Sequence, residues 1–180
     1  MRKLLFLLGI SFTVIAIVVN VQMKQNYMNQ QYGFEGMTLQ EKIAYLEEMK
    51  DEEFSAAIYG NRLEVRGKHG TMKEKLREDE FYLSIAPYVN STHPCDIHNL
   101  TGCQGEWINQ NIQVHVFDLN GNLILEEETM TYDNGFFGIW LPKNIEGIIR
   151  IESDGMSATG EFSTYDTSNT CMTSLQLKSI

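Results

Sequence analysis

The sequence predicts a mainly β protein, in which an antiparallel Ig-like β-sandwich follows a short helical N-terminal region and a membrane-spanning helix. Two observations predict the sandwich. From Glu80 onward apolar residues recur with a period of two, and turn-forming residues interrupt this alternation roughly every eight to twelve residues. A third observation, an uncharged apolar run near the N-terminus, predicts the helix. The chain of 180 residues thus divides into a signal anchor or signal peptide over 1–23, a stalk and helical region over 24–78, and a β-sandwich domain over 79–180.

The N-terminal run extends from Leu4 to Met23 without a charged residue. At about 1.5 Å per residue it forms about 30 Å of helix, which is enough to cross a bilayer. A cleaved secretory signal normally has a shorter apolar region and an A-x-A-like cleavage site, and the end of this run has no small residues at that spacing. We therefore expect an uncleaved anchor that keeps Arg2 and Lys3 in the cytoplasm and places everything after Lys24 outside, with secretion after signal cleavage as the alternative.

A short amphipathic helix is predicted after a Gln- and Asn-rich stalk over residues 22–31. Thr38 to Glu41 fits a capping box, and the apolar pattern continues to Tyr59. Its apolar stripe has helical spacing and consists of Leu39, Ile43, Leu46 and Met49. Because so short a helix cannot bury its stripe alone, we expect it to pack on the rest of the chain or on a second copy. The basic segment 67–79 is expected to be a solvated loop or a short helix.

Seven short strands are predicted in the remaining chain, over residues 81–86, 112–119, 123–128, 135–141, 147–152, 158–163 and 171–177. Asn120-Gly121 favours a tight type I′ hairpin turn between the second and third of them, and Asp154-Gly155 marks the turn between the fifth and sixth. This spacing is typical of an antiparallel sandwich.

The charge of the chain argues against a nucleic-acid partner. The formal net charge is −10 and the pI is about 4.8, whereas a nucleic-acid partner requires clustered Lys and Arg. The acidic excess lies almost entirely from Asp79 onward, so this half of the chain favours cationic partners, metal ions included. The common sequence motifs of nucleotide binding and of hydrolases are absent from the sequence.

The chemistry is concentrated in the connection between the first two predicted strands. This connection carries two imidazoles and two thiols within a short window: His93, Cys95, His98 and Cys103. The whole chain has only three Cys and four His. Thiolate is a soft ligand and imidazole a borderline one, so such a loop suits Cu(I) or Zn(II) far better than Ca²⁺ or Mg²⁺. Gly102 permits the sharp turn that returns Cys103 toward Cys95.

Three interpretations of this window remain open on the residues alone. A disulfide between Cys95 and Cys103 is ordinary in an exported domain, but it leaves Cys171 as an odd thiol. A structural zinc site is the second, although the spacing lacks the paired C-x2-C of common zinc modules. The third is a copper site that Cys171, brought back by the last strand, completes with a third thiolate.

Several short stretches carry a family resemblance: HPC at 93–95, LTGCQGE at 100–106, NGF at 134–136, WLP at 140–142 and TCMTSLQL at 170–177. They resemble the CueP family of periplasmic copper-binding proteins over roughly residues 38–178. The resemblance implies an extracytoplasmic copper-resistance protein that holds copper and reduces Cu(II) to Cu(I). It places these roles on Cys95, Cys103 and Cys171, with His93 and His98 as the assisting histidines. It also implies a homodimer contact in the N-terminal region, and the predicted membrane anchor departs from the family pattern.

Thiol chemistry accounts for such a reduction. A dithiol can give two electrons to two Cu(II) ions and end as a disulfide, and we expect Cys103 and Cys171 to supply them. Repeated turnover would require an external thiol reductase and a copper-acceptor protein, whereas a single round would not. The sequence therefore predicts a metal-binding protein with stoichiometric Cu(II)-reducing activity rather than an enzyme with a substrate pocket. A disulfide-stapled surface binding module and a zinc-binding domain are the alternative functions.

Overall fold

The computed structural model describes the backbone of residues 2–49 and 53–180, and the side chains of residues 15–49 and 53–180. The chain divides into two compact units, Met1–Thr38 and Leu39–Ile180. The first unit consists of α1 (Arg2–Gln31) and the turn that follows it. Across the described part of the chain, no helix combines the length and the apolar character needed to cross a membrane. The anchor predicted over residues 4–23, of which 4–14 lie outside the described side chains, has no support in the structure.

The predicted amphipathic helix is present but shorter than the pattern indicates. It is α2 (Leu39–Glu48), which begins directly after Thr38 as the capping box predicts. The prediction of helix up to Tyr59 is wrong, because residues 54–59 form the strand β1 (Phe54–Tyr59). Ala56 and Ile58 in this strand are fully buried and lie two residues apart. Pairing with a neighbouring strand therefore outweighs the local helical pattern.

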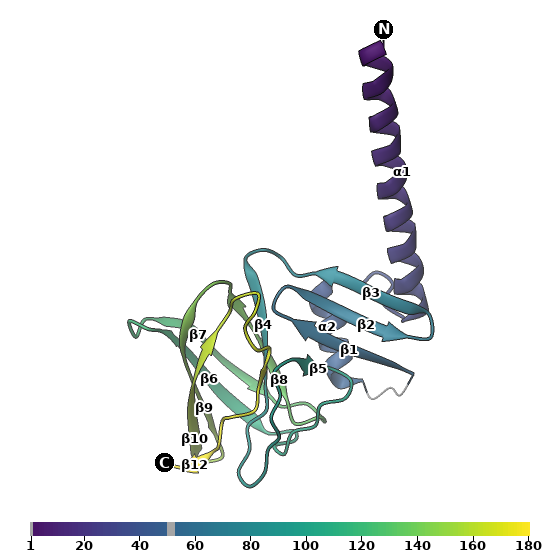
Figure 1. Cartoon of the computed structure of the whole chain (residues 1–180). Helices are drawn as coiled ribbons and strands as arrows, with labels where there is room; N and C mark the ends of the chain where they lie inside the picture. The colour runs from purple at the N-terminus through teal and green to yellow at the C-terminus, as the bar shows by residue number, and fades with distance from the viewer. Residues whose placement is uncertain (1, 50–52) are drawn as a thin grey trace. The chain divides into compact units, whose positions relative to one another are not determined.

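The basic segment predicted as a loop or short helix instead contains the turn and the second strand of a β-hairpin. The strands β2 (Arg62–Gly67) and β3 (Gly70–Lys75) pair antiparallel, and β2 also pairs with β1. With β5 (His98–Asn99) they make a sheet of order β3-β2-β1-β5 (Figure 1). Leu63 and Val65 of this sheet are fully buried. The sheet matters for function because its edge strand β5 carries His98.

Helix α2 packs within its own chain. Ile43 and Leu46, which belong to the predicted apolar stripe, are 1% and 0% exposed. Lys42 is almost fully buried and its Nζ lies 2.6 Å from Glu74 Oε2 on β3. The stripe therefore packs on the rest of the chain, which is the first of the two partners predicted for it. Because Ile43 and Leu46 are covered in this way, the stripe no longer indicates self-association.

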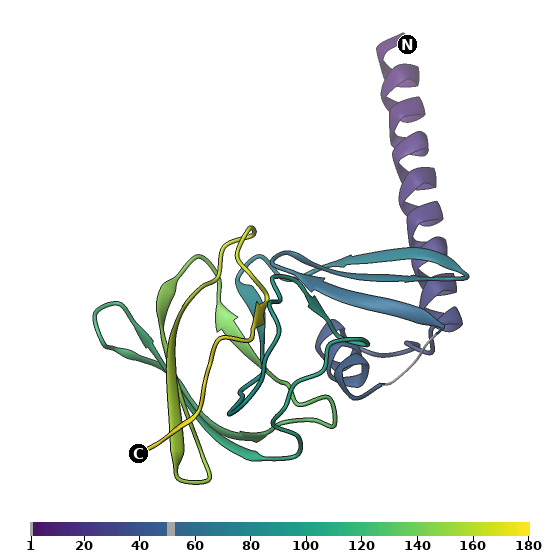
Figure 2. The same cartoon turned by 60° about the horizontal axis from the view of Figure 1, so that its bottom comes forward.

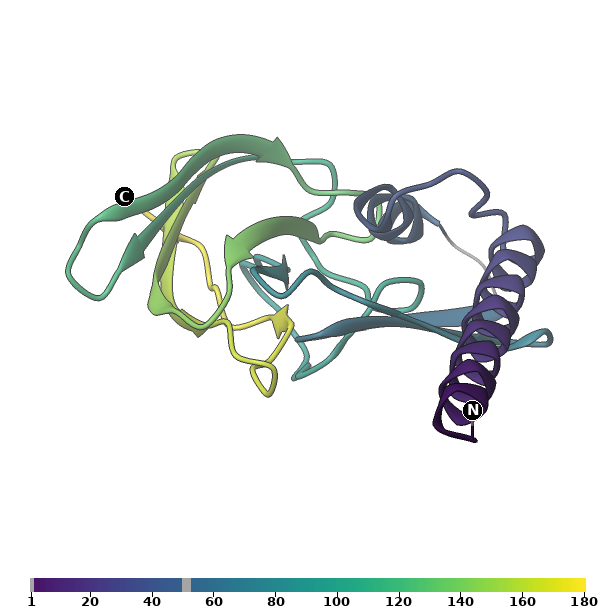
Figure 3. The ribbon, with the colours of Figure 1, turned by 90° about the horizontal axis from the view of Figure 1, so that it is seen from above.

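Two further sheets form the β domain. Their orders are β12-β10-β9-β6-β7 and β11-β4-β8. Their strands are β4 (Glu80–Ile85), β6 (Asn111–Asp118), β7 (Leu123–Met130), β8 (Phe137–Pro142), β9 (Glu146–Ser153), β10 (Met156–Ser163), β11 (Cys171–Met172) and β12 (Lys178–Ser179). The sheets face each other (Figure 3) and share one apolar core, to which β4 contributes Phe81, Leu83 and Ile85 and β6 contributes Ile112, Val114 and Val116. The mainly β, antiparallel prediction is confirmed by this arrangement.

The last predicted strand differs from the prediction. Instead of an antiparallel strand over 171–177, only Cys171 and Met172 form a strand, and β11 runs parallel to β4 (Figure 2). Beyond it, Gln176 makes an isolated bridge to Tyr88. The other edge of β4 pairs with β8, so β4 lies between β8 and β11 in this sheet.

The two predicted turns behave differently. At Asn120-Gly121, Gly121 has a φ of 82°, while Asn120 is not among the described residues with positive φ, so a type I′ turn is excluded. The Asp118 carboxylate holds this loop instead, by accepting from the backbone amides of Asn120 and Asn122. At the other turn Asp154 and Gly155 have φ values of 48° and 71°, as a two-residue I′ turn requires.

Candidate metal centre

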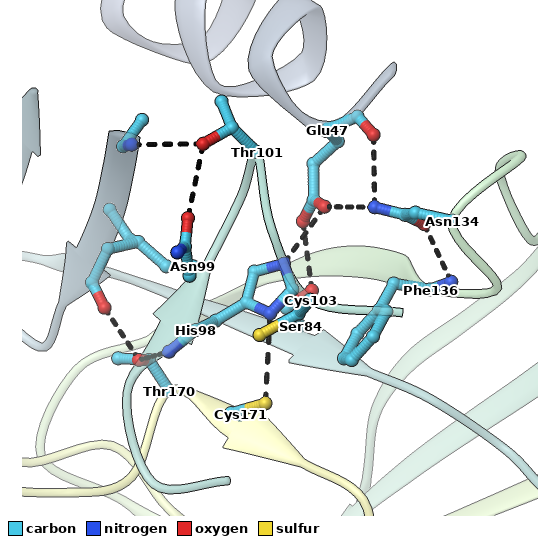
Figure 4. A network of polar contacts seen from close by, with 12 residues as sticks. Glu47, Ser84, His98, Asn99, Thr101, Cys103, Asn134, Phe136, Thr170 and Cys171 are labelled. Carbon is cyan, nitrogen blue, oxygen red and sulfur yellow. Dashed lines mark hydrogen bonds and ion pairs between the residues drawn. The ribbon is translucent and has the colours of Figure 1, made fainter. Parts of the chain in front are cut away.

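Four of the five predicted site residues converge in space. One ligand atom from each of Cys95, His98, Cys103 and Cys171 lies within 4.8 Å of the others. The chain brings them from the loop after β4, from β5, from the turn after β5 and from β11. Figure 4 shows three of them, His98, Cys103 and Cys171, side by side.

The fifth predicted residue, His93, does not belong to this group. It is half-buried and lines a separate cavity of about 280 Å³ together with Glu106. The sequence spacing places His93 close to Cys95 along the chain, but it does not determine on which side of the loop its ring points.

The backbone around β5 explains how Cys103 reaches the group. Leu100 donates its amide to Ala56 O at 2.8 Å, which ties the chain to β1, and the chain then reverses. The amides of Gly102 and Cys103 both donate to Asn99 O, at 3.1 and 2.9 Å. A Cβ at position 102 would lie 2.7 Å from Asn99 Nδ2, so a larger residue here would have to displace the Asn99 side chain. The chain returns Cys103 toward Cys95 as expected, and the two Sγ atoms lie 3.7 Å apart.

Thr170 connects the three segments that meet at the site. Its hydroxyl accepts from the His98 amide at 3.1 Å and donates to Ile58 O on β1 at 2.6 Å. Its own backbone oxygen accepts from Ser84 of β4 at 2.9 Å. These bonds position the next residue, Cys171, with its side chain buried beside the His98 ring.

His98 is fully buried, with a different partner on each ring nitrogen. Its Nε2 lies 2.9 Å from Glu47 Oε2, and neither side chain is exposed. Its Nδ1 lies 3.7 Å from Cys171 Sγ. The Phe136 ring covers it at a centroid distance of 4.4 Å. The imidazole is therefore held on one side by a carboxylate and faces the sulfur atoms with the other.

Glu47 is a site residue that the sequence analysis missed. It lies at the end of α2, 51 residues before His98. Its carboxylate accepts from Ser84 Oγ at 2.8 Å and from Asn134 Nδ2 at 3.1 Å (Figure 4). It also accepts from Tyr82 Oη at 2.9 Å. One signal could have identified it. Glu47 follows Ile43 by four residues, which places a carboxylate on the buried face of the helix.

A pair of glycines brings the segment with Asn134 next to the cysteine loop. Gly105 donates its amide to Asn134 O at 2.6 Å. A Cβ on Gly135 would lie 2.6 Å from the backbone of Gly105, and Gly135 has a φ of 77°. Both the close approach and the left-handed conformation require glycine.

The electrostatics of the cluster favour a thiolate on Cys103. The hydrogen bond from Cys171 is the main cause, and with the contact to His98 it outweighs burial and lowers the pKa of Cys103 to about 3. In turn, the contact with Cys103, together with burial, raises the pKa of Cys171 far above its ordinary range. Burial opposes protonation of His98, but the charge of Glu47 and the contacts with Cys103 and Cys95 raise its pKa well above the usual value. The cluster thus holds a charged sulfur ready for a cation.

The donor set and its access fit a soft metal ion. Three sulfurs and one imidazole nitrogen suit Cu(I) or Zn(II) and not the oxygen-seeking Ca²⁺ or Mg²⁺. A surface cavity of about 830 Å³ reaches Cys95 and Cys171, and Asp96, Glu146 and Glu161 are among the residues that line it. Carboxylates along this opening attract cations toward the sulfurs.

A mainly β domain with such a cluster defines a candidate binding protein for a soft metal ion, and comparisons with known proteins agree. The family model described as periplasmic copper-binding protein CueP matches residues 38–176, and the chain belongs to this family. It is similar to a crystal structure of S.CueP, with 36% sequence identity and a TM-score of 0.80, over 86% of this chain and 97% of that chain. No match is found among the curated proteins. The predicted resemblance is confirmed, and the family supports copper binding and a place outside the cytoplasm.

Proposed function

We propose that this protein binds copper as Cu(I) through Cys95, His98, Cys103 and Cys171, outside the cytoplasm. The observation that carries the proposal is the convergence of these four donors within 4.8 Å. Cu(I) prefers sulfur ligands, and three of the four donors are sulfur. The predicted ligand His93 lies outside the group, so the proposal does not depend on it.

We further propose that the same thiols reduce Cu(II). Two thiolates transfer one electron each to two Cu(II) ions, which become two Cu(I) ions, while the two sulfurs join in a disulfide and any thiol protons pass to solvent. The Cys103 thiolate supports this step because it is the nucleophilic sulfur of the cluster. We expect Cys171 to be its partner. An external thiol reductase would restore the pair, and a copper-acceptor protein would take the ion.

Competition for Cu(I) tests the binding proposal. The reduced full chain, kept anaerobic, is titrated against a chromogenic Cu(I) chelator, and the titration is repeated with Zn(II) as competitor. We expect Cu(I) to bind much more tightly than Zn(II). The matched control is His115→Ala, which removes an imidazole outside the group, beside Glu126 on β7, and should leave the affinity unchanged. Equal competition by Zn(II) would contradict the preference for Cu(I).

Thiol titration separates this proposal from a disulfide-stapled surface module. All three cysteines of the structure are free thiols. After isolation without reductant, the copper proposal expects three titratable thiols that are lost when copper is added. A single thiol that does not respond to copper would favour the surface module.

The cellular placement is a separate proposal. The apolar run over residues 4–23 favours attachment to the membrane. Fractionation of cells that produce the full chain tests it. Recovery of the chain of full mass with the membranes is expected, and recovery of a shortened chain in the soluble extracytoplasmic fraction would favour signal cleavage.

A further inference from the structure

We propose that Glu47 is the positioning residue of the metal centre: it holds the His98 imidazole so that Nδ1, and not Nε2, is the nitrogen offered to copper. The inference rests on the proposed Cu(I) site and adds to it a residue from outside the cysteine loop. It also specifies which ring nitrogen binds.

The two ring nitrogens of His98 have different partners. Nε2 of His98 is 2.9 Å from Glu47 Oε2, whereas Nδ1 points to Cys171 Sγ at 3.7 Å. A nitrogen that donates to a carboxylate keeps its hydrogen, and the other nitrogen is left with a lone pair for a metal. Because Nε2 is engaged by Glu47, Nδ1 is the nitrogen left to bind a metal, and any proton on Nδ1 is released to solvent when the metal binds.

The Glu47 carboxylate is itself held by several hydrogen-bond donors. Oε1 accepts from Tyr82 Oη and Ser84 Oγ, at 2.9 and 2.8 Å, and Oε2 accepts from Asn134 Nδ2 at 3.1 Å. The same amide donates to the Glu47 backbone oxygen at 3.0 Å. These partners come from β4 and from the segment before β8. The carboxylate therefore has one orientation, fixed from two sides.

Two details show that the neighbouring chain is shaped around this network. A Cβ at position 138 would lie 1.8 Å from Tyr82 Oη, so glycine at this position leaves room for the hydroxyl that reaches Glu47. Asn134 Oδ1 accepts from the amide of Phe136 at 2.8 Å. Since the Phe136 ring packs on His98, one short segment orients both the carboxylate and the imidazole.

The burial of Glu47 has an energetic cost. A fully buried carboxylate is costly unless each oxygen is satisfied, and an apolar residue at the end of α2 would bury the same surface without that cost. A purely structural Glu47 would connect α2 to β4 through Tyr82 and Ser84. Its bond to His98 adds nothing to that connection, whereas in metal centres a carboxylate behind a ligating histidine fixes the ring and raises the basicity of the ligand.

The experiment is a double-mutant cycle on Cu(I) affinity, measured on the reduced full chain by chelator competition. Glu47→Gln is made in the unmodified chain and again in a chain that carries His98→Ala. In the unmodified chain the affinity should fall by about 10- to 100-fold, as for other residues that orient metal ligands. In the His98→Ala chain the same change should have no further effect, because the residue through which Glu47 acts is gone. The matched control is Glu48→Gln, which removes the same charge at the exposed neighbouring position and should leave the affinity unchanged.

A second measurement reports the ring nitrogen directly. In ¹⁵N NMR of the Cu(I)-loaded chain, the Nε2 hydrogen of His98 should persist and the Nδ1 resonance should shift. A shift of Nε2 in place of Nδ1 would overturn the inference. If Glu47→Gln does not fold, as judged by circular dichroism, Tyr82→Phe takes its place in the cycle. This change removes one hydrogen-bond donor to the Glu47 carboxylate and keeps the packing of the aromatic ring at position 82.

The outcomes separate this inference from the proposed function. A chain that does not bind Cu(I) at all would refute the proposed function. A chain that binds Cu(I), but loses as much affinity through Glu47→Gln with His98→Ala as without it, would refute only the positioning role.

Discussion

Cys103 Sγ lies 3.7 Å from Cys95 Sγ, and both side chains are partly exposed. The same Cys103 sulfur also accepts a hydrogen bond from the buried Cys171. The Cys103 sulfur therefore contacts both other thiols, and its pKa is lowered to about 3, whereas that of Cys171 is raised. Any disulfide that forms by attack of a thiolate is expected to include it.

Cys103→Ser should abolish the reduction of Cu(II). The unmodified chain should yield about two Cu(I) per molecule without external reductant, since one disulfide releases two electrons. Serine cannot form a disulfide, so Cys103→Ser removes both electrons. The measurement is the Cu(I) trapped by a chromogenic chelator after addition of excess Cu(II).

The same assay identifies the partner of Cys103. Cys171→Ser should yield little Cu(I), whereas Cys95→Ser should retain more. Were Cys171→Ser to yield as much Cu(I) as the unmodified chain and Cys95→Ser none, the reacting pair would be Cys95 with Cys103, and Cys171 would serve as a buried thiol.

The two predicted histidines should differ in their effect on Cu(I) affinity. His98 belongs to the cluster and His93 does not. We expect His98→Ala to weaken Cu(I) binding by at least about tenfold, as loss of a ligand or of its orienting contacts does. His93→Ala should have a smaller effect. Chelator competition on the reduced chain compares them, and equal losses would place His93 in the copper site.

Gly135→Ala should destabilise the fold more than Gly121→Ala. Both positions have positive φ, 77° and 82°, but a Cβ meets nothing within 4 Å at Gly121 and lies 2.6 Å from Gly105 at Gly135. The left-handed backbone alone costs about 1 kcal/mol, which is the loss expected at Gly121. We expect a loss of about 3 kcal/mol at Gly135, because two backbone segments must separate. Denaturant unfolding measures both, and equal losses would mean that this contact relaxes without cost.

Glu106 should make the fold sensitive to acid. Partial burial opposes its ionisation, but hydrogen bonds from the side chain and amide of Asn90 and from the amides of Val89 and Ser91 lower the pKa of Glu106 to about 2. Its ordinary pKa is 4.5. Since the folded-state pKa is the lower one, its contribution is complete above about pH 4.5 and is lost as the pH falls to about 2.

Glu106→Gln tests this expectation. The variant should be less stable than the unmodified chain at neutral pH, and the difference between the two free energies of unfolding should shrink between about pH 4.5 and about pH 2. Glu161→Gln, at an exposed position on β10, serves as the control for the removal of one carboxylate. A Glu106→Gln difference that does not change over this range would contradict the role of the ionised carboxylate.

Sequence by itself determined the β domain and most of the cluster. The alternation from Glu80 onward predicted β4, β6, β7, β8, β9 and β10, because a half-buried strand leaves its period in the order of residues. Cys95, His98 and Cys103 could be found because they share one short loop, and Cys171 because it is the single remaining thiol. Ligand type and local spacing are properties that a linear sequence carries.

Only the tertiary structure decided the remaining features. Residues 54–59 have a pattern that suits a helix as well as a strand, and pairing with β2 made them a strand. The spacing of His93 does not differ in kind from that of His98, yet only the His98 ring points to the sulfurs, because β5 pairs with β1. Glu47 meets His98 across 51 residues. Local pattern determines which face of an element is buried, whereas the partner of that face depends on long-range packing that no local pattern encodes.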